Sequence, residues 1–135
     1  LTFNTIDRHV SQMVKTRISS VKSPWLQGVN IGDVHIIPVS HGEGRFVANK
    51  EVLDELITNG QVFTQYVDDN NQITMESPFN PNGSMYAIEG ILSMEGRIIG
   101  KMGHSERQGE NRFKNIYGEM DQLLFESGVN FFKKK

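Results

Sequence analysis

The sequence contains no cysteine among its 135 residues. It therefore has no disulfide framework, no cysteine-ligated zinc and no thiol nucleophile of its own. The absence fits a cytoplasmic protein, which is the location we expect. Basic and acidic residues nearly balance, 14 against 16, and the net charge is −2. A chain of this charge has no basic footprint for nucleic acid, so we expect no nucleic-acid partner.

Several segments that would define a class of protein are also missing. No apolar run approaches the length of a membrane span and no signal peptide is expected, so we predict no membrane partner. There is no Gly-x-Ser-x-Gly elbow, P-loop, dinucleotide fingerprint or His-Glu-x-x-His motif. The chain begins at Leu1 rather than methionine, which suggests that it was cut from a longer polypeptide. We expect Lys133–Lys135 to form a solvated tail.

The length is that of one domain with a real hydrophobic core. Residues 8–20 carry apolar side chains at a spacing that fits both period 2 and period 3.6, so strand and helix stay open there, although the β-branched content favours a strand. Strands are expected at 35–40 and 62–67. A return strand is expected at 72–76, closing a hairpin through the turn at 68–71.

Two helices are expected. Asn49 is a good N-cap, an apolar stripe follows at 52–57, and Asn59-Gly60 closes the helix. The second helix is expected at 120–132, where Gly128 lowers the helix propensity. The side chains expected to face inward there are Met120, Leu123, Leu124 and Phe131.

The remaining pattern completes an α/β fold. A loop is expected at 77–84, followed by apolar strands at 85–92 and 97–102. The mixed order predicts an open α/β sheet with an antiparallel excursion. Ligands of open α/β sheets bind outside the carboxyl ends of strands. His41 and His104 each follow an expected strand, so both would face one crevice if those strands were parallel neighbours.

Gly103–Arg107 is the most informative motif. His104 and Glu106 are two residues apart at the end of a strand, where both side chains can reach one site. A general base and the carboxylate that orients it need this arrangement. The alternative is a surface ion-pair cluster with Arg107.

His41–Phe46 is the second candidate motif. Gly42 and Gly44 allow the backbone to approach a ligand closely and to present N–H groups to it. The alternative is an ordinary tight turn. A further alternative joins His41, His104 and Glu106 as ligands of a metal ion. Nothing in the spacing requires a metal, and we expect none.

The other candidates are structural. We expect His9 and His35 to have structural roles. Asn80–Ser84 is expected to be a surface turn that could line the mouth of a site.

Four segments resemble those of the phosphoribosylformylglycinamidine synthase family, in the same order and at similar spacing. They are IPVSHGEGRF at 37–46, QYVD at 65–68, NPNGS at 80–84 and GHSER at 103–107. Leu1–Asn4 with Arg8 is also similar to the family's amidotransferase signature, so the resemblance covers nearly the whole chain. The wording FNPNGS at 79–84 and GKMGHSER at 100–107 resembles the large single-chain form more than the small glutaminase subunit. The resemblance implies that residues 1–135 are the C-terminal part of a class I glutamine amidotransferase domain with a flavodoxin-like open sheet.

The resemblance also implies a function. In this family a Cys-His-Glu triad hydrolyses glutamine, and the ammonia passes to a synthase domain that uses ATP and magnesium in purine biosynthesis. By motif match, His104 and Glu106 would be the triad His and Glu. The residues implied beside the glutamine pocket, mainly through backbone contacts, are His41, Gly42, Gly44, Arg45 and Phe46.

Two departures from the family pattern matter. Ser105 stands where many members have proline, which leaves both triad side chains in place. The missing cysteine implies that the nucleophile-bearing half of the domain is absent, so we expect the chain to bind no cofactor and to be inactive alone. Its expected partners are glutamine, the rest of the synthase chain and other copies of itself, through an unpaired sheet edge. The alternative is a module without a nucleophile that binds glutamine or a protein.

Overall fold

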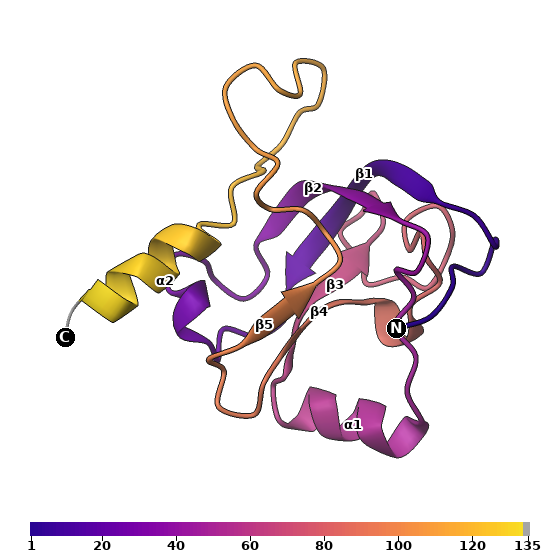
Figure 1. Ribbon diagram of the computed structural model, residues 1–135, viewed down its shortest axis with the longest axis horizontal. Helices are drawn as coiled ribbons and strands as arrows, with labels where there is room; N and C mark the ends of the chain where they lie inside the picture. Colours follow the sequence, from indigo (N-terminus) through magenta and orange to yellow (C-terminus); the bar gives the residue numbers. More distant parts are fainter. Residues whose placement is uncertain (134–135) are drawn as a thin grey trace.

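Residues 1–133, the part of the chain described by the computed structural model, form a five-stranded sheet with two α-helices (Figure 1). The strand order is β2-β1-β3-β4-β5, and every neighbouring pair is antiparallel. The strands are β1 (Val10–Ile18), β2 (Val34–His41), β3 (Val62–Val67), β4 (Ile88–Leu92) and β5 (Ile99–Lys101). The helices are α1 (Lys50–Thr58) and α2 (Leu124–Lys133), with short 3-10 turns η1 (Pro24–Leu26) and η2 (Met85–Ala87).

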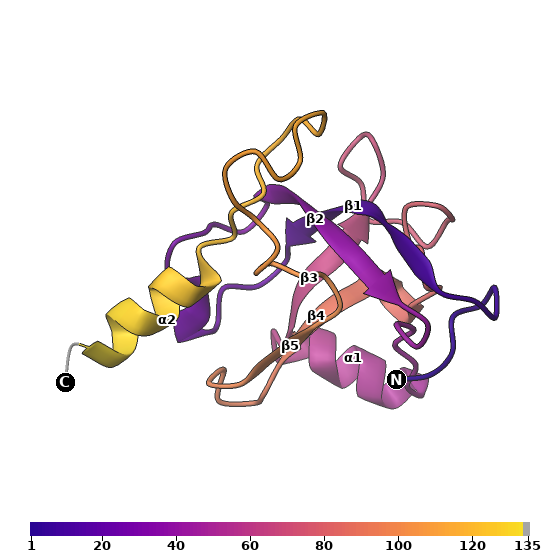
Figure 2. The same cartoon turned by 45° about the horizontal axis from the view of Figure 1, so that its top comes forward.

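The sheet curls so that its two ends approach each other (Figure 2). β2 and β5 lie at opposite ends of the strand order, yet the N–H of His104, just after β5, donates to the carbonyl of Pro38 in β2 at 2.8 Å. The mixed α/β class is as expected. Because each neighbouring pair is antiparallel, β2 and β5 run in the same sense, but they are not neighbours in the strand order and form no strand pair with each other. The expectation that the strands before His41 and His104 are neighbours in the sheet is therefore wrong. Curling of the antiparallel sheet brings the two motifs together instead.

The central strand explains how the core is divided. β3 is buried along its whole length because both of its faces are covered. Val62 packs with Leu53 of α1, and Phe63 packs with Leu124 of α2. The ambiguity at residues 8–20 resolves to a strand, because β1 pairs with β2 on one side and with β3 on the other.

The first helix forms as the sequence predicts. The Asn49 side chain accepts a hydrogen bond from the N–H of Val52 at 2.9 Å. The helix ends at Thr58, and Gly60 follows with φ of +67°, a conformation that glycine adopts without strain. Leu53 is the fully buried residue of this helix.

The second helix begins four residues later than expected. Leu123 has φ of +51°, which a right-handed helix does not allow, so α2 starts at Leu124. Leu124 is buried as expected, but Phe131 is 37% exposed and does not face inward. Gly128 has a packing role. A Cβ at this position would lie 2.2 Å from Cζ3 of Trp25, so glycine lets α2 rest on η1.

Three other expectations need correction. Only one bridge, Val67 to Ile73, stands where a return strand at 72–76 was expected. Residues 85–87 form η2 rather than the start of β4, and Tyr86 there has φ of 52°. β5 is shorter than the 97–102 expected.

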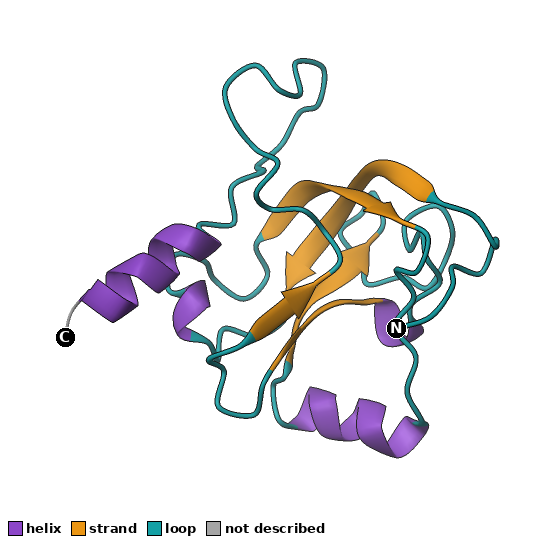
Figure 3. Cartoon of the chain, in the orientation of Figure 1, coloured by secondary structure: helices purple, strands orange, loops and turns teal. Residues whose placement is uncertain are grey.

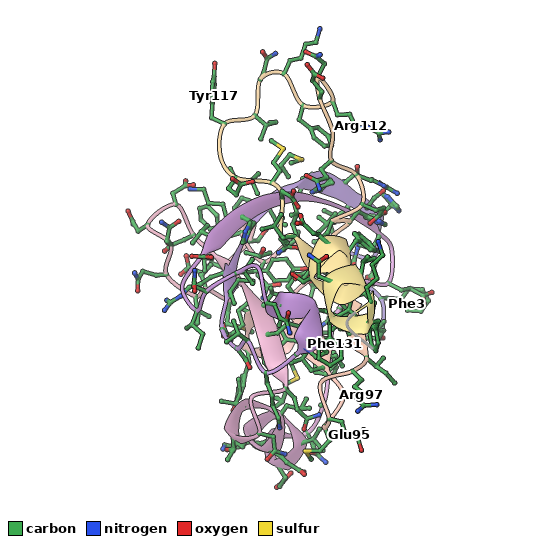
Figure 4. All side chains as sticks on the ribbon, turned by 90° about the vertical axis from the view of Figure 1, so that its left-hand side faces the viewer. Phe3, Glu95, Arg97, Arg112, Tyr117 and Phe131 are labelled. Carbon is green, nitrogen blue, oxygen red and sulfur yellow. The ribbon has the colours of Figure 1, made fainter. Side chains whose placement is uncertain are left out.

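The segment between β5 and α2 is a long projecting loop (Figure 3). Figure 4 shows Arg112 and Tyr117 near its far end, and Tyr117 is 88% exposed. Of the expected tail at 133–135, residues 134 and 135 lie outside the described part of the chain. Within residues 1–133, no helix is both long enough and apolar enough to cross a membrane.

Candidate functional site

His104 and Glu106 meet in a tight turn. The N–H of Arg107 donates to the carbonyl of His104 at 3.1 Å, which closes a four-residue turn after β5. The turn places Nδ1 of His104 2.8 Å from Oε1 of Glu106. An ionised carboxylate only accepts hydrogen bonds, so Nδ1 carries the proton and Nε2 is left as the basic nitrogen. The pairing expected from the two-residue spacing is therefore present, through a turn rather than an extended strand.

His41 restrains the other face of the same ring. It ends β2, and its imidazole stacks on that of His104 with ring centres 4.9 Å apart and planes 5° apart. Nε2 of His104 is buried and has no hydrogen-bond partner among the described residues. Both rings line a cavity of about 460 Å³ whose wall is mainly apolar. Its apolar wall includes Trp25, Ile98, Leu124 and Phe125.

The charges around this cavity are set by burial and by neighbouring groups. Burial, followed by the positive charges of His104, His9 and Arg107, lowers the pKa of His41 below 6.5. His41 is therefore neutral at pH 7 and does not repel a protonated ring at position 104. Partial burial raises the pKa of Glu106, but its own backbone N–H, the His104 hydrogen bond and nearby positive charges outweigh burial, and the net pKa is lowered. Glu106 is ionised at pH 7. Its contact with Arg107, at 3.8 Å between Oε1 and Nε, is exposed and contributes little.

The remaining residues of the second motif are placed differently from His41. Nε of Arg45 donates to the carbonyl of Gly83 at 3.2 Å, and Phe46 packs against the cluster around Leu53. Of the five residues implied beside the glutamine pocket, only His41 lines the cavity next to His104. Gly42 and Gly44 contribute backbone groups to hydrogen bonds with Asn4.

Asn4 holds that backbone in place. Its N–H donates to the carbonyl of Gly42 at 3.0 Å, and its Oδ1 accepts from the N–H of Gly44 at 3.0 Å. Its Nδ2 donates to the carbonyl of His41 at 2.7 Å. Asn4 is 1% exposed, so these bonds form away from water. The N-terminal motif therefore fixes the path of the second motif.

Residues 80–84 support the second motif from the other side. Nδ2 of Asn82 and Oγ of Ser84 each donate to the carbonyl of Gly44, both at 3.3 Å, and the N–H of Phe46 donates to Oγ of Ser84 at 3.0 Å. Asn82 and Ser84 are fully buried, so the expected surface turn is wrong. The sequence signal that could have shown this is the run of short polar side chains at 80–84.

A buried ion pair beneath the turn that carries His104 was also missed. Glu89 of β4 and Lys101 of β5 approach to 3.3 Å between Oε1 and Nζ. The available signal was one charge of each sign inside two adjacent apolar strands. Their register follows from the pairing of Gly90 with Lys101.

The geometry does not suit the metal alternative. Ring nitrogens of two stacked imidazoles direct their lone pairs side by side rather than toward one point. No group of three potential metal ligands is found among the described residues.

A His and a carboxylate in one turn, with a second imidazole stacked on the first, line one cavity. Comparison with known proteins identifies the class. The profile of the CobB/CobQ-like glutamine amidotransferase domain matches residues 1–133, and the chain belongs to this family. The mixed α/β fold, with its curled antiparallel sheet, fits the same assignment.

Curated relatives give a more specific likeness. The chain is 36% identical over 120 residues to phosphoribosylformylglycinamidine synthase subunit PurQ of Acaryochloris marina, covering 89% of the chain and 48% of that relative. It is 37% identical over 132 residues to the subunit of the same name in Methanosarcina barkeri, covering 97% of the chain and 54% of that relative. The likeness expected from the sequence motifs is thus confirmed. Whether the chain comes from the single-chain form stays a prediction.

A solved structure agrees with these relatives. The chain superimposes on one chain of the PurLQS structure from Thermotoga maritima with a TM-score of 0.72 and 26% identity, covering 98% of this chain and 52% of the other. The chain spans about half the length of the relatives and of the structure that it matches.

Proposed function

We propose that this chain supplies His104 and Glu106 of a Cys-His-Glu triad that hydrolyses glutamine to glutamate and ammonia. The ammonia serves phosphoribosylformylglycinamidine synthesis in purine biosynthesis. The observation that carries the proposal is the 2.8 Å contact between His104 and Glu106 at a cavity, in a chain related to PurQ subunits. ATP and magnesium belong to the synthase part and not to this chain.

The chemistry follows from the protonation state of His104. With Nδ1–H held by Glu106, Nε2 can take the proton of a cysteine thiol. The thiolate then adds to the carboxamide carbon of glutamine, and the imidazolium returns its proton to the departing nitrogen, so that ammonia leaves. The glutamyl thioester is hydrolysed by water, which His104 deprotonates in turn. Neutral His41 restrains the His104 ring without opposing its positive charge.

The nucleophile comes from residues beyond these 135. The chain has no cysteine, and it covers 48% and 54% of two PurQ relatives. The buried Nε2 of His104 has no hydrogen-bond partner among the described residues, and a thiol from another segment would supply the partner that it lacks. The apolar wall of the cavity is the surface on which that segment would pack.

Complementation tests the proposal directly. The 135-residue chain alone should release no ammonia from glutamine, and adding the cysteine-bearing segment of the parent protein should restore release. Glutamine binding by the 135 residues alone, measured by calorimetry, would favour a binding module instead.

Glu106→Gln should lower kcat for glutamine hydrolysis by about 10²–10³-fold. The amide can present its NH₂ group to Nδ1, which favours the wrong tautomer of His104. The effect should be smaller than that of removing His104, because the Glu106 side chain is 56% exposed and its field is screened. Glutamate release by the full-length protein is the measurement, with Arg107→Gln as the control. Equal losses in both variants would contradict an orienting role.

Gly44→Ala should raise KM for glutamine by about tenfold. The added Cβ would lie 2.1 Å from Nδ2 of Asn82, so the backbone of the second motif must move. Gly42→Ala is the matched control, since its Cβ meets nothing within 4 Å. Steady-state kinetics of glutamate release compare the two variants. A KM in Gly44→Ala no higher than in Gly42→Ala would argue against a role for this backbone in binding.

The isolated 135-residue chain should self-associate. Among the described strands β5 pairs only with β4, and Ile98 beside it is 71% exposed; Leu1 and Phe3 are 76% and 65% exposed. Figure 4 shows Phe3 projecting from the molecule. Light scattering should give a mass above that of one chain, and Ile98→Lys should reduce it. A clean monomer at high concentration would count against the proposal of a missing half.

A further inference from the structure

The turn that carries His104 rests on a buried carboxylate. The Glu89 side chain is 0% exposed, and its Oε1 accepts a hydrogen bond from the N–H of Gly103 at 2.5 Å. Its other oxygen accepts from the Thr64 hydroxyl. The carbonyl of Glu89 accepts from the N–H of Met102 at 3.0 Å. Glu89 therefore holds the backbone immediately before His104.

Lys101 holds the turn on both sides of His104. Its Nζ lies 3.3 Å from Oε1 of Glu89 and donates to the carbonyl of Gly103 at 3.1 Å. It also donates to Oγ of Ser105 at 2.8 Å. The side chain is only 11% exposed, so these partners take the place of water around its ammonium group.

Ser105 extends the connection to the segment before α2. Its hydroxyl accepts a hydrogen bond from Lys101 and donates one to Oε1 of Gln122. The hydroxyl therefore acts as both acceptor and donor. Ser105 is 8% exposed and Gln122 is 1% exposed. Ser105 stands second in the turn closed by Arg107, the position at which a fixed φ near −65° stabilises a turn. A serine does not fix φ itself, so its side-chain bonds must hold it.

The backbone at Gly103, where the turn begins, is closely packed against its neighbours. A Cβ on Gly103 would lie 2.1 Å from Cδ1 of Ile37 and 2.9 Å from Oε1 of Glu89. The turn is therefore pressed against β2 on one side and against the carboxylate on the other. A small shift of either support moves the imidazole of His104.

From these contacts we propose that Glu89 and Lys101 are positioning residues for His104, acting through Gly103 and Ser105. This inference rests on the proposed function, since it concerns the geometry of that triad. Neither residue touches the substrate. They hold the imidazole where its Nε2 can meet the thiol, and a displacement of about 1 Å at such a site can cost about 10²-fold in rate.

The test uses the full-length protein and separates geometry from folding. Lys101→Met should lower kcat for glutamine hydrolysis by about 10–100-fold. KM for glutamine and synthesis supported by added ammonia should both stay within about twofold of wild type, because a displaced base weakens chemistry more than binding. Lys15→Met is the matched control, because Lys15 also pairs at 3.3 Å, with Asp69, but with side chains 31% and 79% exposed.

A rescue variant shows whether geometry is the cause. Ser105→Pro added to Lys101→Met should restore kcat to within about threefold, since proline fixes φ at the second turn position. The N–H of Ser105 makes no backbone hydrogen bond among the described residues, so proline removes none. If Lys101→Met does not fold, the neutral pair Glu89→Gln with Lys101→Met takes its place, because it leaves no unpaired buried charge.

The possible results separate the two proposals. Unchanged kcat in Lys101→Met or in the neutral pair would overturn the inference, as would an equal loss of ammonia-supported synthesis or a failed rescue. If His104→Ala in the same protein retains glutamine hydrolysis, the proposed function itself has failed and the inference falls with it. Loss in both His104→Ala and Lys101→Met, with rescue by Ser105→Pro in the second, supports both.

Discussion

Replacing His104 by alanine in the full-length protein should lower kcat for glutamine hydrolysis by about 10³-fold or more. In the proposed mechanism, the alanine variant has no base to take the thiol proton and no acid to protonate the departing ammonia. Among the described residues, His41 is a poor substitute, because burial and neighbouring positive charges lower its pKa and so weaken it as a base. The measurement is glutamate release under saturating glutamine.

Two controls identify the step that is lost. Synthesis supported by added ammonia should be unchanged in His104→Ala, because the synthase reaction does not use this side chain. His9→Ala should behave as wild type, since His9 is exposed and contacts only Oγ of Ser40 at 3.0 Å among its side-chain hydrogen bonds. Near-normal glutamine hydrolysis in His104→Ala would rule out the triad assignment.

Glu89→Ala should lower the free energy of unfolding of the chain by about 3–5 kcal/mol. Removing the carboxylate leaves the buried ammonium of Lys101 without its counter-charge. It also leaves the N–H of Gly103 and the hydroxyl of Thr64 without an acceptor. Chemical denaturation followed by circular dichroism measures the loss.

The comparison variants show whether the buried charge is the cause. Glu95→Ala should change stability by less than about 0.5 kcal/mol, because Glu95 is exposed at the turn between β4 and β5 (Figure 4). Glu89→Leu combined with Lys101→Met should be less destabilised than Glu89→Ala, since the double variant buries no charge. If the double variant is the less stable of the two, packing rather than charge dominates at this position.

Local signals in the sequence predicted the elements that depend on local interactions. The N-cap at Asn49, the apolar stripe and the glycine at 60 together define α1, and β3 follows from its β-branched and aromatic content. The start of α2 was missed because Leu123 has a positive φ, which no propensity of leucine suggests. The order of the strands and the curl of the sheet come from long-range packing that no short window contains.

The candidate site was predicted only in part, because some of its contacts are local in the sequence and others depend on long-range packing. The spacing of His104 and Glu106 is local, so their pairing could be expected from the sequence. The stack of His41 on His104 depends on the curl that brings β2 to the segment after β5. The ion pair of Glu89 and Lys101 depends on the register of β4 and β5. The last two contacts join residues of separate segments of the chain, which no short stretch of the sequence contains together.

The distance between Nε2 of His104 and the nearest cysteine Sγ in a structure of the full-length protein is the most direct test of the central claim. We expect about 3–4 Å, which allows direct transfer of the thiol proton, with Nδ1 still bound to Glu106. A structure in which no cysteine approaches within about 6 Å of Nε2, or in which another side chain occupies that position, would contradict the claim that this chain completes a glutamine-hydrolysing triad.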